Sequence, residues 1–268
     1  MSRKAKTKKN NFNIGVVFFA LFFSLVFMSL LIKFIVIYKN STFDGLHRKT
    51  VAFYQGEGIK VLSFSPQNKS ISLLNVKENI KPEDISSYLR IPVETVIVDK
   101  SLDIRKTNIF LNLLGVLLKH KNKSSELTFI DIIRLMLFTR SVPSESIYEK
   151  DLVEGSDIAR KDYVSSTLFA DTAISNDKKR VEIINATEIS GFGNRMADAL
   201  SNLGADVVLV ITSEKVEDRS RIYYYGEKTY TISRLSSMFR YPTELAREKS
   251  LADVIIILGR DSISTDKF

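Results

Sequence analysis

The chain has 268 residues and no cysteine, so it can hold neither a disulfide framework nor a metal site built on thiolates. It has two histidines, and we predict no metal site and no cofactor. Residues 1–39 hold seven basic residues and no acid, while the remaining 32 basic and 31 acidic residues nearly cancel. The net charge of +8 is therefore concentrated at the N-terminus, and we expect no nucleic-acid partner.

Residues 14–38 are predicted to form a single transmembrane helix. Residues 14–32 carry no charge, and a run of this length is sufficient to cross a bilayer. A cleaved secretory signal has a shorter apolar core, and the segment YKNSTFDGL that follows is a poor cleavage site. A core helix of a soluble protein is rarely so uniformly apolar.

The basic tail of residues 1–13 predicts the orientation of this helix. Basic residues are enriched on the cytoplasmic side of membrane spans, so the tail is expected in the cytoplasm and the rest of the chain outside the membrane. A DNA-binding tail is the alternative interpretation of the same charges.

A first α/β domain is predicted over residues 39–169. The turn formers GEG and PQNK separate runs rich in β-branched and aromatic residues, which predicts an antiparallel meander of strands at 50–55, 59–65 and 70–76. Pro82 lies in the first turn of a short helix, and a further strand is expected at 93–99.

Two strongly apolar helices are expected next, at 109–118 and 129–138. Each is too short to span a bilayer, and periodicity does not separate a pair of buried core helices from a lipid-facing surface. A more polar helix is expected within 157–171, and residues 170–179 are predicted to be a linker.

A small second α/β domain is predicted over residues 180–268. Strands alternate with helices, which indicates a layered structure with parallel pairing. The expected strands are 181–185, 206–211, 221–225 and 253–258, and the expected helices are 194–203 and 229–239.

The second domain resembles the LytR C-terminal module of LytR–CpsA–Psr proteins. The resemblance rests on VEIINAT, GFGNRMADALSNLGADV, SRIYYYG and the closing ADVIIILGRD. The stretch VLSFSPQNKSISLLNVKEN resembles the opening strands of the family's catalytic domain, and YLRIPVETVIVDKSLDI resembles the stretch before its central helix. The resemblance implies a reduced relative of that domain in front of the C-terminal module.

Full members of this family transfer glycopolymers from a polyprenyl-pyrophosphate carrier, and they hold the pyrophosphate and a metal ion with arginines and an aspartate. The family's P-R-D turn corresponds here to Val76, Lys77 and Glu78. Lysine cannot provide the planar bidentate grip of arginine on phosphate. Lys77 and Glu78 are therefore residual pyrophosphate-turn positions, and no catalytic residue is assigned.

The glycine-bearing turn after residue 185 is the first candidate binding site. It lacks the third glycine of a dinucleotide fingerprint, although Glu214 stands near the place of a ribose-binding acid. Loops at the carboxyl edge of parallel strands and the start of a helix favour anions, such as a phosphate or uronate of a wall polymer. The candidate residues for this site are Gly191, Gly193, Asn194, Arg195 and Arg260, and a purely structural turn is the alternative.

A second candidate surface lies in the strand RIYYYG. Arg221, Tyr223 and Tyr225 share one face of this strand, where they could stack on sugars or on a partner protein. His47 and His120 are not part of any recognisable catalytic arrangement.

These features predict a single-pass membrane protein of bacterial cell-envelope biogenesis with an extracytoplasmic body. Its expected role is non-catalytic binding of a wall glycopolymer or an envelope protein. A glycopolymer phosphotransferase is the alternative, and a transcriptional regulator is a third interpretation.

Overall fold

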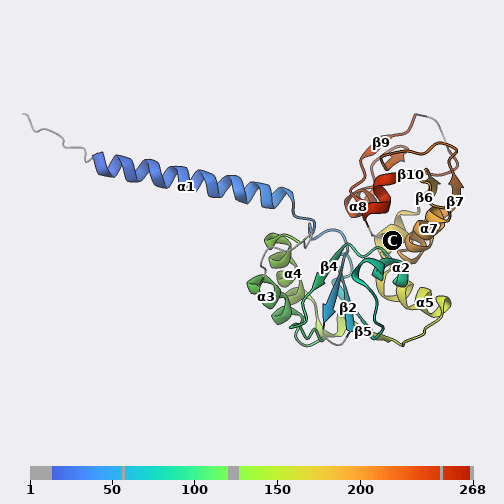
Figure 1. Ribbon diagram of the computed structural model, residues 1–268, viewed down its shortest axis with the longest axis horizontal. Helices are drawn as coiled ribbons and strands as arrows, with labels where there is room; N and C mark the ends of the chain where they lie inside the picture. Colours follow the sequence, from blue (N-terminus) through green and yellow to red (C-terminus); the bar gives the residue numbers. More distant parts are fainter. Residues whose placement is uncertain (1–13, 56–57, 120–126, 248–249, 266–268) are drawn as a thin grey trace, which may run out of the picture. The chain divides into compact units, whose positions relative to one another are not determined.

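The computed structural model describes residues 14–55, 58–119, 127–247 and 250–265 (Figure 1). The chain divides into two compact units, the first ending at Ser41 and the second beginning at Thr42. The first unit contains helix α1 (Ile14–Lys39). Within the described residues, α1 is the one helix long and apolar enough to cross a membrane, and its side chains are exposed. At 1.5 Å per residue, its 26 residues extend roughly 39 Å.

The second unit begins with a five-stranded sheet, here called sheet A. Its strand order is β4-β1-β2-β3-β5. The central strands form the expected antiparallel meander, with bounds within one residue of the prediction: β1 (Lys49–Gln55), β2 (Gly58–Ser65) and β3 (Ser70–Val76). The two edge strands pair in parallel with their neighbours, β4 (Thr95–Val98) with β1 and β5 (Ile147–Leu152) with β3.

Helices cover both faces of sheet A. On one face, α3 (Ile109–Lys119) and α4 (Phe129–Ser141) pack against a core that includes Phe53, Phe64 and Leu113. On the other face, α2 (Ile85–Leu89), which follows a 3-10 turn at Pro82–Asp84, and α5 (Ile158–Phe169) enclose a second core around Val61 and Leu168. The two cores arise because successive residues of each strand point to opposite faces.

A second five-stranded sheet, here called sheet B, has the order β7-β6-β10-β8-β9. The helices α6 (Thr172–Asp177), α7 (Phe192–Asn202) and α8 (Tyr230–Phe239) contribute to one core on one of its faces. The strands are β6 (Arg180–Asn185), β7 (Asp206–Thr212), β8 (Arg221–Tyr224), β9 (Thr243–Leu245) and β10 (Val254–Leu258).

The expected parallel pairing is confirmed for β7, β6 and β10 but is wrong for β8. Strand β8 runs antiparallel to β10. The connection from β7 to β8 covers residues 213–220 and contains no helix. A parallel partner requires a crossover of a dozen or more residues, so this short connection returns the chain along the same edge of the sheet.

The segment 170–179, expected as a linker, is folded. It contains α6, whose Ile174 is buried in the core of sheet B, and Asp171 just before α6 is also buried. The division of residues 39–268 into separate domains at residues 169 and 180 stays a prediction.

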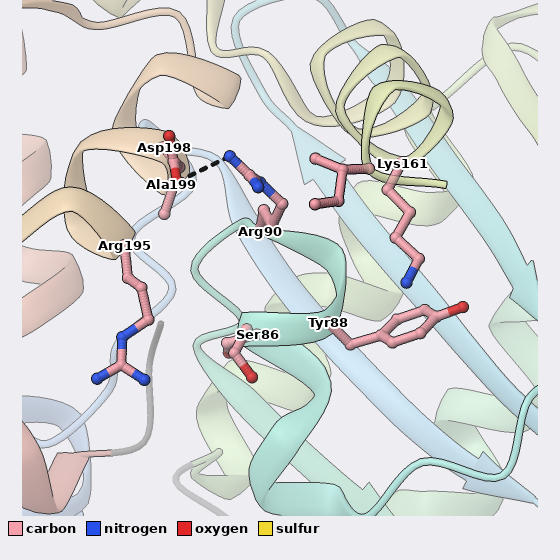
Figure 2. Close-up of a pocket in the computed structure, with 9 residues that line it drawn as sticks. Ser86, Tyr88, Arg90, Lys161, Arg195, Asp198 and Ala199 are labelled. Atoms are coloured by element: carbon pink, nitrogen blue, oxygen red, sulfur yellow. Dashed lines mark ion pairs between the residues drawn. The ribbon is translucent and has the colours of Figure 1, made fainter. Parts of the chain in front are cut away.

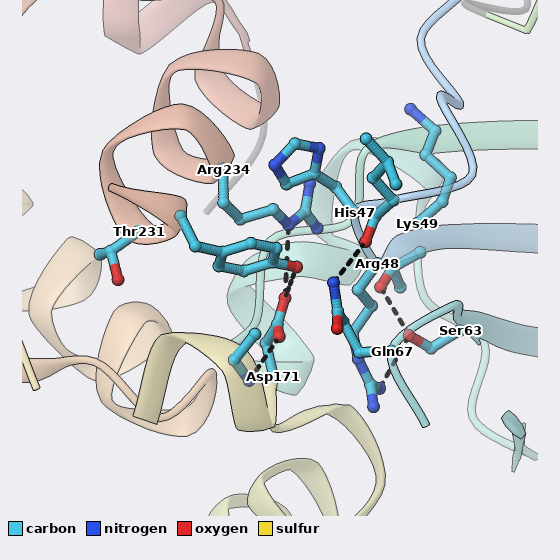
Figure 3. Close-up of polar contacts among 12 residues, drawn as sticks. His47, Arg48, Lys49, Ser63, Gln67, Asp171, Thr231 and Arg234 are labelled. Atoms are coloured by element: carbon cyan, nitrogen blue, oxygen red, sulfur yellow. Dashed lines mark hydrogen bonds and ion pairs between the residues drawn. The ribbon is translucent and has the colours of Figure 1, made fainter. Parts of the chain in front are cut away.

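A buried cluster of charges joins elements of the two sheets, and Figure 3 shows its members Arg234, Asp171 and Lys49. Glu94, just before β4, accepts a hydrogen bond from Arg234 of α8 at 2.8 Å and from Lys49 of β1 at 3.3 Å. Arg234 also approaches Asp171 at 3.7 Å, and Tyr230 donates a hydrogen bond to Asp171 at 3.0 Å. These contacts couple the start of sheet A to α8 of sheet B.

Candidate functional site

The turn after β6 is held by its own side chains. Asn185 Oδ1 accepts hydrogen bonds from the backbone N–H of Thr187 at 3.1 Å and from its hydroxyl at 2.7 Å. Asn185 Nδ2 donates to the carbonyl of Ile189 at 2.9 Å. The side chains of the N-x-T motif therefore fix the conformation of the loop before α7 through local hydrogen bonds.

The two glycines of this turn meet different backbone requirements. Gly191 caps α7 with φ of 75°, a conformation that residues with a side chain rarely adopt. Gly193 is buried inside the first turn of α7, where an added Cβ would lie 3.0 Å from Val210 Cγ1 and 3.2 Å from Asn185 Cβ. Gly191 is needed for its backbone conformation, and Gly193 lets α7 approach β6 and β7 closely.

Replacing Gly191 with alanine should destabilise the protein by about 1 kcal/mol, because alanine is strained at positive φ. Gly193→Ala should cost a similar amount through crowding against Val210. Gly115→Ala is the matched control, since an added Cβ there would meet one atom of Leu102 at 3.9 Å. Urea unfolding of the three variants provides the measurement, and a Gly191 variant as stable as the Gly115 variant would contradict this account.

The carboxyl ends of β6, β7 and β10 share one edge of sheet B, as expected from their parallel pairing. The connection 213–220 lies along this edge: the N–H of Ser213 donates to Asn185 O, and that of Glu217 donates to Ala186 O. Arg260 donates to Glu188 Oε1 at 2.7 Å and to Asp218 Oδ1 at 3.2 Å. The hydrogen bond from Arg260 lowers the pKa of Glu188. The guanidinium of Arg260 is thus engaged by two carboxylates, and the chain itself covers part of this edge.

Arg195 faces a pocket that Arg260 does not line. The pocket has a volume of about 290 Å³ and lies where α2, α5 and α7 meet (Figure 2). Its lining residues are Ser86, Ser87, Tyr88, Arg90, Ile158, Lys161, Arg195, Asp198 and Ala199. Arg195 is exposed, and its guanidinium lies 5.2 Å from the centroid of the Phe192 ring. Asn194 is also exposed but does not line the pocket.

Three cations from three helical elements converge on this pocket. Arg90, which ends α2 with φ of 54°, pairs with Asp162 at 2.9 Å and with Asp198 at 2.7 Å. Lys161 Nζ lies 3.6 Å from the centroid of the Tyr88 ring (Figure 2). Among the described residues, neither Lys161 nor Arg195 has a carboxylate within ion-pair distance. The pocket therefore offers two cations without an ion-pair partner and one aromatic ring, which are groups that bind anionic sugars.

Lys77 and Glu78 do not form a cation-rich site. Lys77 is exposed and lines a second pocket with Lys60, Asp103 and Asp151. Glu78 accepts a hydrogen bond from the hydroxyl of Tyr88. Burial, and then this hydrogen bond to Glu78, raise the pKa of Tyr88, so its hydroxyl stays protonated as a donor.

Arg221 and Tyr223 lie on the face of sheet B opposite its core. In register with them on β10 are Ile257 and Ile255, which are half-buried, and Tyr225 is also half-buried. On β7 the same face carries Leu209 and Ile211, which are 38% and 40% exposed. The predicted stacking residues thus border an apolar sheet face, and their use by sugars or a partner protein stays a prediction.

The described residues include no group of three or more histidines and carboxylates close enough to hold a metal ion. His47 pairs with Asp44, and its ring lies 4.9 Å from that of Tyr230. His120 lies outside the described residues.

These observations define a mixed α/β protein with one N-terminal apolar helix. Residues 178–261 match the family model LytR_C, described as LytR cell envelope-related transcriptional attenuator. The protein therefore carries a LytR C-terminal domain, which points to a cell-envelope-related function. No curated protein and no solved structure matches the chain. The resemblance of residues 39–169 to a catalytic domain stays a prediction.

Several pocket residues were not predicted as site residues. Tyr88 and Arg90 stand in a stretch noted for its family resemblance, and Lys161 stands in an ordinary polar helix. These three residues come together at the pocket where α2, α5 and α7 meet, and no shared sequence pattern marks them. The left-handed backbone of Arg90 is a local signal of a helix end, but it does not indicate a ligand.

Proposed function

We propose that the protein is a membrane-anchored, extracytoplasmic component of bacterial cell-envelope biogenesis that binds an anionic wall polymer. The observation that carries this proposal is the convergence of Lys161 and Arg195, beside Arg90 and Tyr88, on one pocket. The LytR C-terminal domain supports an envelope role, and this domain contains Arg195. The length and exposure of α1 support an anchor.

The proposed role is binding rather than phosphoryl transfer. The residual pyrophosphate turn has a lysine and a glutamate, and that glutamate is engaged by Tyr88. Lys77 stands beside Asp103 and Asp151, whose negative charges disfavour a pyrophosphate there. Polymer transfer from a polyprenyl-pyrophosphate by the purified protein, lost in Lys77→Ala, would favour the phosphotransferase instead.

The proposed topology makes a direct prediction. The chain has no cysteine, so a single introduced cysteine reports its own location. In spheroplasts, a membrane-impermeant maleimide should label Glu227→Cys without permeabilisation, because Glu227 is exposed in the proposed extracytoplasmic body. Ser2→Cys should react with the maleimide only after the spheroplasts have been permeabilised. The reverse labelling pattern would overturn both the orientation and the extracytoplasmic role.

Polymer binding should depend on the pocket cations Lys161 and Arg195. Arg195→Ala and Lys161→Ala should each weaken binding of poly(glycerol phosphate) or polygalacturonate about five- to tenfold, which corresponds to about 1–1.4 kcal/mol of lost charge-assisted contacts. Titration calorimetry of the detergent-solubilised chain measures this loss, and added salt should weaken wild-type binding.

Arg247→Ala is the matched control for these variants. Arg247 is an exposed arginine near β9 and does not line the pocket, so its removal changes the net charge equally and should leave affinity unchanged. An equal loss with Arg247→Ala would indicate diffuse electrostatic attraction and would contradict a site at the pocket.

A further inference from the structure

The outward side of the α3–α4 pair exposes large apolar side chains. We call it the hairpin outer face; its residues are Leu111, Leu118, Phe129 and Leu137. The two helices lie side by side and antiparallel, since Arg140 near the end of α4 lies 5.7 Å from the ring of Phe110 near the start of α3 (Figure 1). Leu118 is 77% exposed, and Leu137 is 62% exposed.

Helix α3 is apolar on its inner and its outer side. Ile109, Leu113 and Val116 are buried against sheet A, while Leu111 and Leu118 point outward. A helix that covers a soluble core normally carries polar residues on the side that faces water. Leu111 and Leu118 are exposed and are not part of the core of sheet A, so a contact with another apolar phase explains them better.

The charges of the hairpin favour an anionic surface. Asp131 is the only acidic residue in the sequences of α3 and α4, and its side chain is fully buried. Arg140 at the end of α4 is exposed beside the hairpin outer face. The outward side of these helices therefore presents apolar and basic groups, which is the composition of segments that lie in the headgroup region of anionic bilayers.

The chain attaches α4 to the residues that follow the anchor. Asp131 Oδ1 accepts hydrogen bonds from the N–H groups of Thr42 at 2.8 Å and Phe43 at 2.7 Å. Arg134 donates to the carbonyl of Phe43 at 2.8 Å. Asn40 and Ser41 separate the end of α1 at Lys39 from Thr42, and the three Cα–Cα steps of this stretch reach at most about 11 Å. An anchor in the membrane thus tethers α4 close to the lipid surface.

We propose that the hairpin outer face lies in the interfacial layer of the anionic membrane in which α1 is anchored. This inference rests on the proposed anchor and adds a second, peripheral contact. That contact would restrict the orientation of the extracytoplasmic body relative to the membrane. A second copy of the chain or another protein on this face is the competing occupant.

Depth-dependent quenching of single labels tests the proposal on the full chain in proteoliposomes containing phosphatidylglycerol. Leu118→Cys and Leu137→Cys carry an environment-sensitive fluorophore, and a nitroxide on the lipid acyl chain is the quencher. Leu251→Cys is the matched control, because Leu251 is a leucine with 77% exposure near β10, outside the hairpin. Leu25→Cys in α1 reports the anchor itself.

We expect the lipid nitroxide to remove about half of the fluorescence at Leu118 and Leu137, and less than about a tenth at Leu251. Quenching at either hairpin position no greater than at Leu251, with strong quenching at Leu25, would overturn the hairpin contact while keeping the anchor. No quenching at Leu25 would refute the anchor. Hairpin labels shielded from aqueous iodide but not reached by the lipid nitroxide would assign the face to a protein and overturn the lipid contact.

Discussion

Glu94→Gln should lower the free energy of unfolding by about 3–5 kcal/mol, the usual cost of leaving a buried partner charge unpaired. Glu94 is 5% exposed, and its carboxylate stands between Arg234 and Lys49, which are also buried. Burial alone raises the pKa of Glu94, but the charges of Arg234 and Lys49 and the hydrogen bonds that it accepts lower it to about 2. Glutamine keeps the volume but removes the carboxylate that pairs with Lys49, and it leaves Arg234 with Asp171, at 3.7 Å, as its buried carboxylate partner.

The acid limb of the stability curve provides a second readout of the same contact. Because the folded-state pKa of Glu94 is depressed below 4.5, its contribution is complete above about pH 4.5 and is lost as the pH falls toward 2. The difference in stability between wild type and Glu94→Gln should therefore shrink across this window. Urea unfolding of the detergent-solubilised chain at several pH values measures it.

Glu227→Gln is the control for this experiment. Glu227 is exposed in the loop before α8, so neutralising it should change stability by less than about 0.5 kcal/mol. If Glu94→Gln were as stable as Glu227→Gln, the ion pairs of Glu94 would not hold the two sheet regions together.

Asp131→Ala should destabilise the chain by about 3 kcal/mol or more. The carboxylate accepts hydrogen bonds from the N–H groups of Thr42 and Phe43, and from both the N–H and the hydroxyl of Thr128 at 2.7 and 2.8 Å. Alanine leaves these donors without their acceptor and removes the capping box that starts α4.

Urea unfolding measures the global effect of Asp131→Ala, and hydrogen exchange locates it. The amides of Thr42 and Phe43 should lose protection, because Asp131 is their acceptor. Asp206→Ala, at an exposed position that begins β7, is the control and should change little. A loss below about 1 kcal/mol for Asp131→Ala, with both amides still protected, would show that other contacts hold this segment.

Local sequence patterns determined most elements of the fold. Strands β1, β2 and β3 were predicted within a residue because turn formers flank runs of β-branched residues, and α7 begins where Gly191 permits a left-handed turn. The uncharged run of α1 and the motifs of the LytR C-terminal domain are also contiguous in sequence, so both could be recognised without a structure.

Elements without such a local signal were missed. Strand β5, IYEKDL, is an edge strand with three consecutive charged residues, and its partner β3 lies 76 residues earlier in the sequence. Helix α6 occupies a segment that is polar enough to be expected as a linker, and Ile174 alone ties it into the core of sheet B. In both cases pairing with distant residues stabilises an element that its own sequence only weakly favours.

The tertiary structure alone decided which charged residues meet. Arg195 and Arg260 were both assigned to one sheet edge, yet Arg260 is bound by Glu188 and Asp218, while Arg195 faces the pocket with Lys161. Glu94 and Arg234 are 140 positions apart and form the buried ion pair. A charged side chain carries no local mark of its partner, because the attraction depends on distance and burial, and the packing of the two sheets and their helices sets both.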